Sequence, residues 1–495
     1  MSTENGKLRK VGFNYSPAKL VLLVIATFFM FGFKYIPIAG LSASGVQVIG
    51  ILIGGMILWL SMGVGWTSLY VLFALMTVPE LGAAKVCSTS FGNSTAILMI
   101  YCYMLAACLT KSGFARRIAI MLMTNRFSRK SAWNTVMMFL LACFIIGLFL
   151  PSSGSILVTL PIMDAMLSEV KLSKEKKPAV GAMLSLGSVI AGSLGNGATP
   201  ISHAMSIQGM GLFKDYTGNT IDFFTFCAVL LPIGVICLVL YWLMAKYLWR
   251  PDVDALKEVD FDALKASAGS MTTREKWSAY VYLFVIILWA LPGFAKYIAP
   301  SVYPTLNKIS NLYPPLIGLF LMNLITLEDG KPVLAFKDAL NNVNWGTFIF
   351  LGGIMCLGAA VSNADIGISA WLTAVLSPLF SNISPAVFLF IMVAIGVILT
   401  NFVSNAVALA VMMAVAMPLA LGVYGDTLNT LVVALLVINA VQHAWATPPG
   451  TPSAAVAADF GWLDLGSMFK WGMIIALIDI LVIYFVGSGL GAIFC

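Results

Sequence analysis

Two polar stretches that interrupt apolar sequence contain the same Ala-Thr-Pro triplet. Residues 446–452 read Ala-Thr-Pro-Pro-Gly-Thr-Pro, and residues 195–200 read Gly-Asn-Gly-Ala-Thr-Pro. Because proline removes a backbone donor and ends a helix, each stretch should break a membrane helix. The N-terminus of the helix after a break carries partial positive charge and holds anions, while freed carbonyl oxygens suit a hard cation such as sodium. These stretches predict a site for an anion and sodium ions near the middle of the membrane.

Two further polar knots lie between pairs of apolar arms. Phe149–Ile156 reads Phe-Leu-Pro-Ser-Ser-Gly-Ser-Ile, and Thr400–Ala406 reads Thr-Asn-Phe-Val-Ser-Asn-Ala. The first knot is flanked by basic loops at 111–130 and 169–177, and such loops are cytoplasmic. The chain between them must therefore enter the membrane and return, which predicts a re-entrant hairpin whose tip is buried in protein or faces water. Two short tilted spans are the alternative.

The composition is that of a membrane protein. The chain has 495 residues, of which 60% are hydrophobic and 10% charged, whereas soluble domains carry about 25% charged residues. A crossing of about 30 Å of hydrocarbon needs roughly 20 apolar residues. We predict an all-α polytopic membrane protein with about eleven transmembrane helices plus two opposed re-entrant hairpins. The predicted spans are 18–38, 45–62, 65–79, 93–110, 179–206, 224–248, 277–297, 312–327, 345–363, 427–460 and 468–491.

The basic residues also predict the orientation. Lys7, Arg9 and Lys10 indicate a cytoplasmic N-terminus, and an odd number of crossings then puts the C-terminus outside. We expect a multi-pass protein of the cell inner (plasma) membrane. A signal peptide cleaved near Ala43 is the alternative interpretation of the first span. Because topology accounts for the bases, the net charge of +7 does not indicate a nucleic-acid partner.

The chain reads as two similar halves. Each half contains three spans, an amphipathic connector, a hairpin with a polar tip, a broken span and a final span. Five crossings in each half make the second repeat inverted relative to the first, and such repeats with paired broken helices indicate a secondary transporter. The predicted divisions are an N-terminal tail and first span (1–44), a first repeat (45–249, with hairpin 132–168 and broken helix 179–206), a cytoplasmic linker (250–276) and a second repeat (277–495, with hairpin 385–424 and broken helix 427–460).

This arrangement resembles the divalent anion:sodium symporter (DASS) family, within the wider ion transporter superfamily. The family has a Ser-Asn-Thr triplet at each hairpin tip and a Thr-Pro-rich break in each half. Here Ser404-Asn405-Ala406 stands at the second tip, and Ala446-Thr447-Pro448-Pro449 matches the break. The first tip departs from the pattern, because Pro151-Ser152-Ser153-Gly154 lacks the asparagine.

The resemblance implies ligands residue by residue. One sodium ion would be held by Thr400, Asn405 and the carbonyls of Val403 and Ala446. A second would use Ser152, Ser153 and Gly154 with the carbonyls of Gly197 or Ala198. The substrate would contact Ser153, Gly154, Thr199, Pro200, Ser404, Asn405, Ala406, Thr447 and Pro448.

The substrate class remains open at this stage. No lysine or arginine lies in the predicted site, so dipoles, hydroxyls and bound cations must recognise the anion. Because lost hydrogen-bonding groups at the first tip and at Ala406 affect discrimination strongly, an ordinary four-carbon dicarboxylate is disfavoured. Di- or tricarboxylates, sulfate-like oxyanions and sulfonates all fit.

Three ionisable residues inside apolar sequence have two interpretations each. His203 and His443 lie four residues from Thr199 and Thr447, about one helical turn, so either can face the site and take a proton. A hydrogen-bonded packing role is the alternative. Asp479 lies within the last span, where an acid is a functional candidate, either in ion coupling or in a structural pair.

We therefore expect a secondary active transporter for a small anion. The resemblance implies sodium symport by an elevator mechanism and a homodimer in the lipid bilayer. We expect no enzyme activity and no cofactor other than transported sodium, since the sequence has no nucleotide-binding loop and no HExxH motif. A proton-coupled symporter or an anion exchanger on the same fold is the first alternative, and an anion channel is the second.

Overall fold

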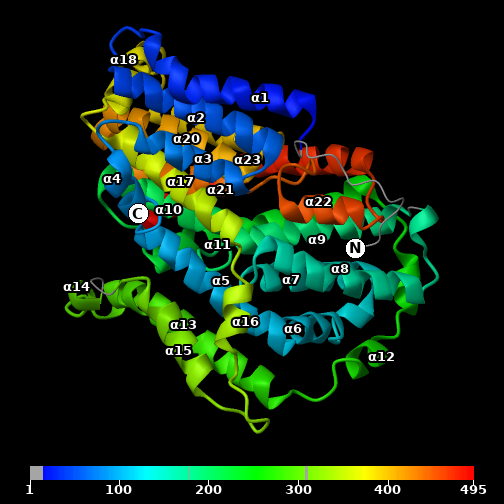
Figure 1. The fold of residues 1–495 in the computed structure, drawn as a ribbon. Helices are drawn as coiled ribbons and strands as arrows, with labels where there is room; N and C mark the ends of the chain where they lie inside the picture. Colours follow the sequence, from blue (N-terminus) through cyan, green and yellow to red (C-terminus); the bar gives the residue numbers. More distant parts are fainter. Residues whose placement is uncertain (1–14, 177, 307–309) are drawn as a thin grey trace, which may run out of the picture.

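The computed structural model describes residues 15–176, 178–306 and 310–495, which form a bundle of helices (Figure 1). In hydrocarbon, a helix satisfies all of its backbone hydrogen bonds within one segment. Apart from one isolated bridge between Thr326 and Pro332, the described residues contain no β-structure. The all-helical membrane fold predicted from the sequence is confirmed. The bases Lys7, Arg9 and Lys10 lie outside the described residues.

The helices of the two halves follow one another in the same order. The first half consists of α2 (Ala43–Met62), α3 (Gly65–Met76), α4 (Gly82–Thr89), α5 (Ser94–Ser112), α6 (Phe114–Met123), α7 (Ala132–Gly147), α8 (Ser152–Glu169), α9 (Ala179–Gly197), α10 (Ala204–Thr217) and α11 (Phe223–Met244). The second half consists of α13 (Thr273–Ile298), α15 (Tyr313–Leu324), α16 (Phe336–Asn341), α17 (Trp345–Ser362), α18 (Ile368–Phe380), α19 (Pro385–Thr400), α20 (Asn405–Leu419), α21 (Thr430–Ala440), α22 (Pro452–Asp459) and α23 (Leu465–Phe494). Outside this order lie α1 (Pro17–Thr27), α12 (Phe261–Ala266) and α14 (Tyr303–Leu306). The inversion of one half relative to the other stays a prediction.

Both helix breaks occur in the stretches that the prolines mark. In the first half α9 ends at Gly197 and α10 begins at Ala204. In the second half α21 ends at Ala440 and α22 begins at Pro452. The predicted broken helix ended at residue 206, but α10 continues to Thr217. It ends there because Gly218 takes a left-handed conformation with φ of 74°.

Each predicted hairpin returns to the place where it enters. The start and the end of the α7–α8 hairpin are both bonded to the linker, because Arg129 pairs with Asp262 and Glu169 accepts from the backbone of Asp260. At the second hairpin, the Tyr424 hydroxyl donates to the carbonyl oxygen of Phe380 at 3.0 Å, which joins the end of the hairpin to its entrance. Each hairpin therefore begins and ends on the same side of the bundle, as both a re-entrant hairpin and a pair of full crossings require.

Nine helices in the described chain are long and apolar enough to cross a membrane, or up to ten if a bent pair counts as one span. The sequence predicted about eleven crossings, and the difference comes from helix length. Predicted spans at α3, α15 and α21 have helices of 12, 12 and 11 residues, and a 12-residue helix extends only about 18 Å. Asn405–Thr427 is long and apolar enough to cross, although it belongs to the predicted second hairpin.

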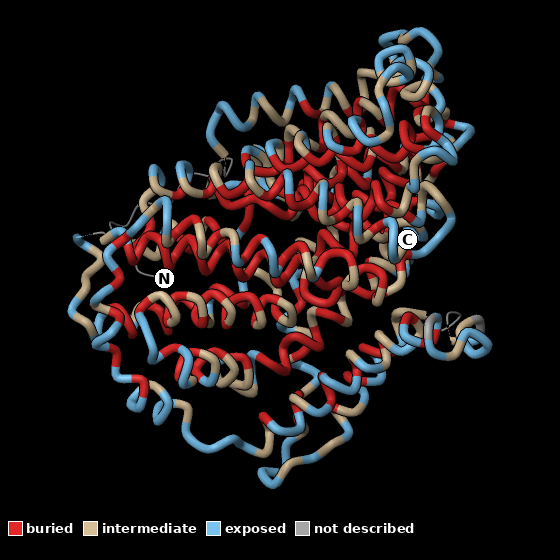
Figure 2. The backbone as a smooth tube through the Cα atoms, turned by 180° about the vertical axis from the view of Figure 1, so that it is seen from behind, coloured by how far each residue is buried: buried red, intermediate tan, exposed pale blue. Residues whose placement is uncertain are grey.

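The two helices that precede the breaks form the centre of the bundle. All residues of α9 from Val180 to Gly197 are buried, and so are those of α21 from Val432 to Ala440. Figure 2 shows buried backbone through the middle of the molecule and exposed backbone along the linker and the outer helices. The breaks therefore lie in the protein interior, where irregular backbone is tolerated in a membrane.

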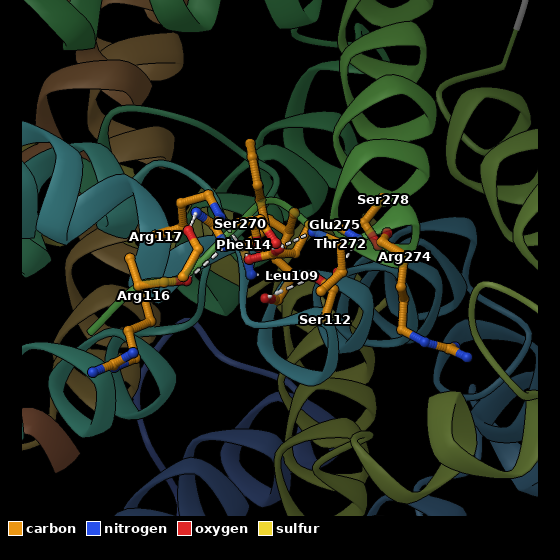
Figure 3. Close-up of polar contacts among 12 residues, drawn as sticks. Leu109, Ser112, Phe114, Arg116, Arg117, Ser270, Thr272, Arg274, Glu275 and Ser278 are labelled. Atoms are coloured by element: carbon orange, nitrogen blue, oxygen red, sulfur yellow. Dashed lines mark hydrogen bonds and ion pairs between the residues drawn. The ribbon is translucent and has the colours of Figure 1, made fainter. Parts of the chain in front are cut away.

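The linker is anchored by one buried ion pair. The Arg117 guanidinium of α6 donates to both carboxylate oxygens of Glu275 at 2.8 and 3.0 Å, and also to the carbonyls of Ala268, Gly269 and Ser270 (Figure 3). Glu275 is in the first turn of α13, so this pair joins α6 to the start of the second half.

We predict that Arg117→Ala lowers the free energy of unfolding by about 3 kcal/mol, because it leaves a buried carboxylate without its partner. Thermal unfolding in detergent measures the change. Lys111→Ala is the control, since its pair with Asp338 is solvent-exposed and worth only about 0–1 kcal/mol. Equal effects of the two variants would contradict the anchoring role.

Candidate functional site

One cavity of about 350 Å³ lies where both hairpin tips and both helix breaks meet. The first tip contributes Ser152 and Ser153, and the second contributes Ser404 and Asn405. The breaks contribute His203 and the loop from Pro448 to Pro452. A volume of this size suits a small molecule.

Six helices begin at the wall of this cavity. In each case the residue before the helix or a residue of its first turn lines the cavity. These residues are Val64 for α3, Ser152 and Ser153 for α8, His203 and Ala204 for α10, Asn344 and Thr347 for α17, Ser404 and Asn405 for α20, and Thr451 and Pro452 for α22. Since every helix N-terminus carries about half a positive charge, the six together favour an anion.

Three of these N-termini have backbone donors that no side chain caps. The helices α17, α20 and α22 are capped by Asn344, Ser404 and Thr451. The helices α3, α8 and α10 make no side-chain cap hydrogen bond. The first four N–H groups of a helix need partners from outside it. The first-half tip and break therefore offer free donors to a ligand even though the first tip lacks an asparagine side chain.

The cavity wall combines apolar surface with hydrogen-bonding groups and has no carboxylate, lysine or arginine among the described residues. The hydrogen-bonding side chains on the wall include Tyr103 of α5 and His203, whose Nδ1 is buried without a hydrogen-bond partner. An anion in this cavity would be held by main-chain dipoles, hydroxyls and amides, as the sequence predicts.

A buried asparagine fixes the first tip to the first break. The Asn196 side chain donates to the carbonyl oxygens of Leu150 at 2.6 Å and Ser202 at 3.1 Å. Ser202 donates in turn to the carbonyl of Gly147 at 2.9 Å, and Thr199 donates to that of Leu148 at 2.9 Å. These bonds satisfy the carbonyls that the end of α7 leaves without helical partners.

A second asparagine fixes the second tip to the second break. Asn401 donates from its side-chain nitrogen to the carbonyl of His443 at 2.8 Å and accepts from the backbone N–H groups of Trp445 and Ala446. The Thr447 hydroxyl donates to the Asn401 carbonyl. Each half thus has one asparagine that joins its tip to its break.

Two glutamines connect the halves. Gln208 of α10 donates to the carbonyl of Ala406 at 3.3 Å, and Gln442 donates to the Ser206 hydroxyl at 3.2 Å. A side chain at Gly197 would collide with Gln442, because an added Cβ would lie 1.9 Å from the amide oxygen. The two breaks are therefore in direct contact.

The structure brings six of the residues predicted from the sequence to the cavity wall: Ser152, Ser153, Ser404, Asn405, Ala406 and Pro448. Gly154, Thr199, Pro200 and Thr447 are not on it. Thr199 and Thr447 use their hydroxyls to bond the hairpin carbonyls instead.

The two predicted cation sets differ in their arrangement. In the second half, Thr400 and Ala446 are buried where the tip meets the break, the Thr400 hydroxyl donates to the Val441 carbonyl, and the Asn405 backbone N–H donates to the Gly450 carbonyl. Val403 is half-buried beside them. In the first half, Gly197 faces Gln442 and Ala198 is buried at the end of α9, whereas Ser152 and Ser153 face the cavity.

Sequence reasoning missed Asn196, Asn401, Ser202, Tyr103 and Asn344. Both asparagines of the tip–break contacts stand inside the quoted polar stretches, so their burial among apolar residues was the available signal. Tyr103 and Asn344 come from helices far from either stretch, and no local pattern marks them.

Comparisons with known proteins identify the family and a similar fold. The family model described as "Sodium:sulfate symporter transmembrane region" matches residues 17–494. An uncharacterised transporter of Methanocaldococcus jannaschii is 25% identical over 357 residues, which cover 71% of this chain and 72% of that protein. The sodium-dependent dicarboxylate transporter SdcS of Staphylococcus saprophyticus is 23% identical over 457 residues, which cover 90% and 86%. The crystal structure of the Alcanivorax borkumensis YdaH transporter has a similar fold, with a TM-score of 0.55, 11% identity and coverage of 90% of this chain and 98% of that one.

We predict that Asn401→Ala lowers the free energy of unfolding by about 3 kcal/mol, because it leaves the His443 carbonyl and two backbone N–H groups buried without partners. Thermal unfolding in detergent measures this loss. Asn323→Ala is the matched control, since Asn323 makes one bond within its own helix, to Leu319. If both variants unfold at the same temperature, Asn401 does not hold the break in place.

Proposed function

We propose that this chain, which belongs to the sodium:sulfate symporter family, imports or exports a small divalent anion together with sodium. Members of this family, the divalent anion:sodium symporters, are membrane transporters and not enzymes. The observation that carries the proposal is the single cavity on which both tips, both breaks and six helix N-termini converge.

The anion in this proposal lies between the two tips. Ser153 and Asn405 face it from opposite halves, and the uncapped N-termini of α8 and α10 donate to its oxygens. Sulfate and small dicarboxylates both have the required charge. The relative SdcS is named for dicarboxylates and the family for sulfate, so both classes belong in the first assays.

Sodium in this proposal binds behind the second tip, at Thr400, Val403, Asn405 and Ala446. Two features support this position. The region has buried carbonyl and hydroxyl oxygens, which are the ligands that hard cations prefer, and it contacts the cavity through Asn405. A bound cation there would add positive charge next to the anion and would order the tip.

An elevator movement fits the origin of the cavity wall. One group of lining residues comes from the hairpins and the helices after the breaks, α8, α10, α20 and α22. The other group comes from α3, α5 and α17. In the proposal the first group moves with the bound anion while the second, with α2, α13 and α15, stays fixed. A site between two bodies becomes accessible from either side when one slides past the other.

We also propose a homodimer in the cell inner membrane, with the N-terminus in the cytoplasm and the C-terminus outside. The proposed repeats are 45–249 and 277–495. The helices α13 and α15 of the second half extend from the rest of the bundle (Figure 1) and expose apolar side chains such as Leu283, Ile287 and Phe320, which a second copy of the chain could cover. Light scattering of the purified protein in detergent measures the oligomeric state.

We predict that Ser153→Asp lowers the affinity for the transported anion roughly tenfold or more, because it puts a carboxylate at the N-terminus of α8 beside the ligand. Ser153→Asn is the control of equal size without charge and should stay within about threefold of the wild type. A thermal-shift titration with sulfate and with succinate, each in sodium and in choline, measures the affinity. Equal binding by the Asp and Asn variants would place the anion elsewhere.

Uptake by liposomes tests sodium coupling. We predict that Asn405→Ala abolishes the part of uptake that an inward sodium gradient drives, since the tip then loses a cation ligand, while the protein still folds. Asn429→Ala is the control, because Asn429 is an exposed cap of α21 that does not line the cavity. Uptake that is indifferent to sodium in the wild type would reject sodium symport.

A further inference from the structure

A histidine and an acid are buried together behind the second break. His443 Nδ1 lies 3.1 Å from a carboxylate oxygen of Asp479, and the two side chains are 2% and 0% exposed. Asp479 projects from the middle of α23, and His443 belongs to the loop between α21 and α22. Neither residue lines the cavity that is proposed to hold the anion.

The surroundings of the pair contain no fixed positive charge. The helices α9, α11, α19 and α21 pack against α23, and α9, α19 and α21 have no titratable side chain in their sequences. On α11, Cys237 approaches the pair, with its sulfur, a His443 nitrogen and an Asp479 oxygen all within 4.8 Å of one another. The other titratable groups of α11 are Cys227 and Tyr241, and Tyr241 is bonded to the Met183 carbonyl. On α23 itself, Lys470 lies over the ring of Trp471, more than two turns before Asp479.

This environment favours forms of the His443–Asp479 pair in which the net charge is zero. A bare carboxylate in an apolar interior is costly unless a cation or a proton compensates it. With no lysine or arginine pairing with Asp479 among the described residues, the pair is stable either as aspartic acid with neutral imidazole or as carboxylate with imidazolium. Both forms contain one proton more than carboxylate with neutral imidazole.

We propose that His443 and Asp479 form a binding site for one exchangeable proton, and that this proton is a coupling ion of the transport cycle. The coupling part of this proposal rests on the transport function proposed above. When the pair is formed the proton lies between the two side chains. When this proton is lost, the carboxylate charge stays behind the second break without a compensating positive charge.

A continuous set of contacts connects the proton to the hairpin tip. The His443 carbonyl accepts from Asn401, and Asn401 also accepts from the N–H groups of Trp445 and Ala446. Asn401 lies three residues before Ser404 at the tip. The helix α23 contacts the same segment a second time at Gly472, where an added Cβ would lie 2.8 Å from the Ala446 Cα. A change at Asp479 therefore acts directly on the backbone that fixes the tip.

Cys237, His443 and Asp479 carry donor atoms that bind metals, but their geometry favours a proton as the ligand. A tetrahedral structural site takes four ligands, and three donors come together here among the described residues. The histidine and the aspartate are already at hydrogen-bonding distance from each other. Zinc bound stoichiometrically to the purified protein, measured by elemental analysis, would overturn the proposal.

Transport measurements test the coupling. Full-length protein is placed in liposomes that contain a fluorescent pH indicator, with the membrane potential clamped by potassium and valinomycin, and sulfate or succinate is added outside. We expect anion uptake to acidify the lumen, and Asp479→Asn and His443→Gln to reduce the protons moved per anion to below about a tenth of the wild-type value. Asp215→Asn is the matched control, since Asp215 also has a buried oxygen without a partner but does not touch the break, and it should keep the wild-type ratio. An unchanged ratio in Asp479→Asn would overturn the coupling.

A second measurement decides the proton site even if neither anion is transported, which would refute the proposed function alone. Folded protein that holds a proton released on unfolding loses stability as the pH rises. We expect the unfolding temperature of the wild type in detergent to fall as the pH is raised, and the fall to be smaller in Asp479→Asn, in which no carboxylate remains to be left without a compensating charge. Identical pH profiles of the two proteins would show that the pair does not bind an exchangeable proton.

Discussion

The convergence of six helix N-termini on one cavity is the feature on which the rest of the structure depends. Hydrocarbon disfavours charged side chains, and no cationic side chain lines this cavity in the described chain. Helix dipoles provide positive potential without a lysine or arginine side chain, whose charge would lose its hydration in the empty site. Four of these N-termini belong to α8, α10, α20 and α22, and they meet because the chain interrupts two helices and turns sharply at two hairpin tips. The prolines and glycines of the two breaks and of the first tip provide these interruptions.

Broken helices leave main-chain groups that must find partners in the protein interior. The structure meets this requirement with a few buried amides, of which Asn196 and Asn401 are the most connected. Each joins a tip to the break of its own half, while Gln208 and Gln442 join one half to the other. Close approach of the backbone is possible because glycine occupies the contact points, as at Gly197 against Gln442 and at Gly472 against Ala446. The tips and breaks thus form one bonded unit, which is what a body that carries the anion across the membrane would need to be.

The sequence was sufficient for the helical fold, the family and the positions of both breaks. Prolines and basic loops act locally, so their effects can be read without coordinates. The number of crossings was less certain, because apolar residues continue past the ends of α3 and α15 and conceal how short these helices are. The direction of individual side chains could not be read either. Thr199 and Thr447 looked like ligands, but the nearest unsatisfied groups are the carbonyls of Leu148 and Asn401, and the two hydroxyls bond there. The meeting of His443 with Asp479 depends on how α23 packs, which spacing along the chain does not indicate.

The position of the bound anion tests the central claim most directly. A second polar cavity, of about 260 Å³, is lined by Lys214, Asp222 and Asn311 and contains the positive side chain that the first lacks. A cryo-electron microscopy map of the protein with a saturating concentration of the anion that stabilises it most would distinguish the two. Our account predicts density for the anion between Ser153 and Asn405, at the N-termini of α8 and α20. Density beside Lys214, with the cavity between the tips unchanged, would contradict it.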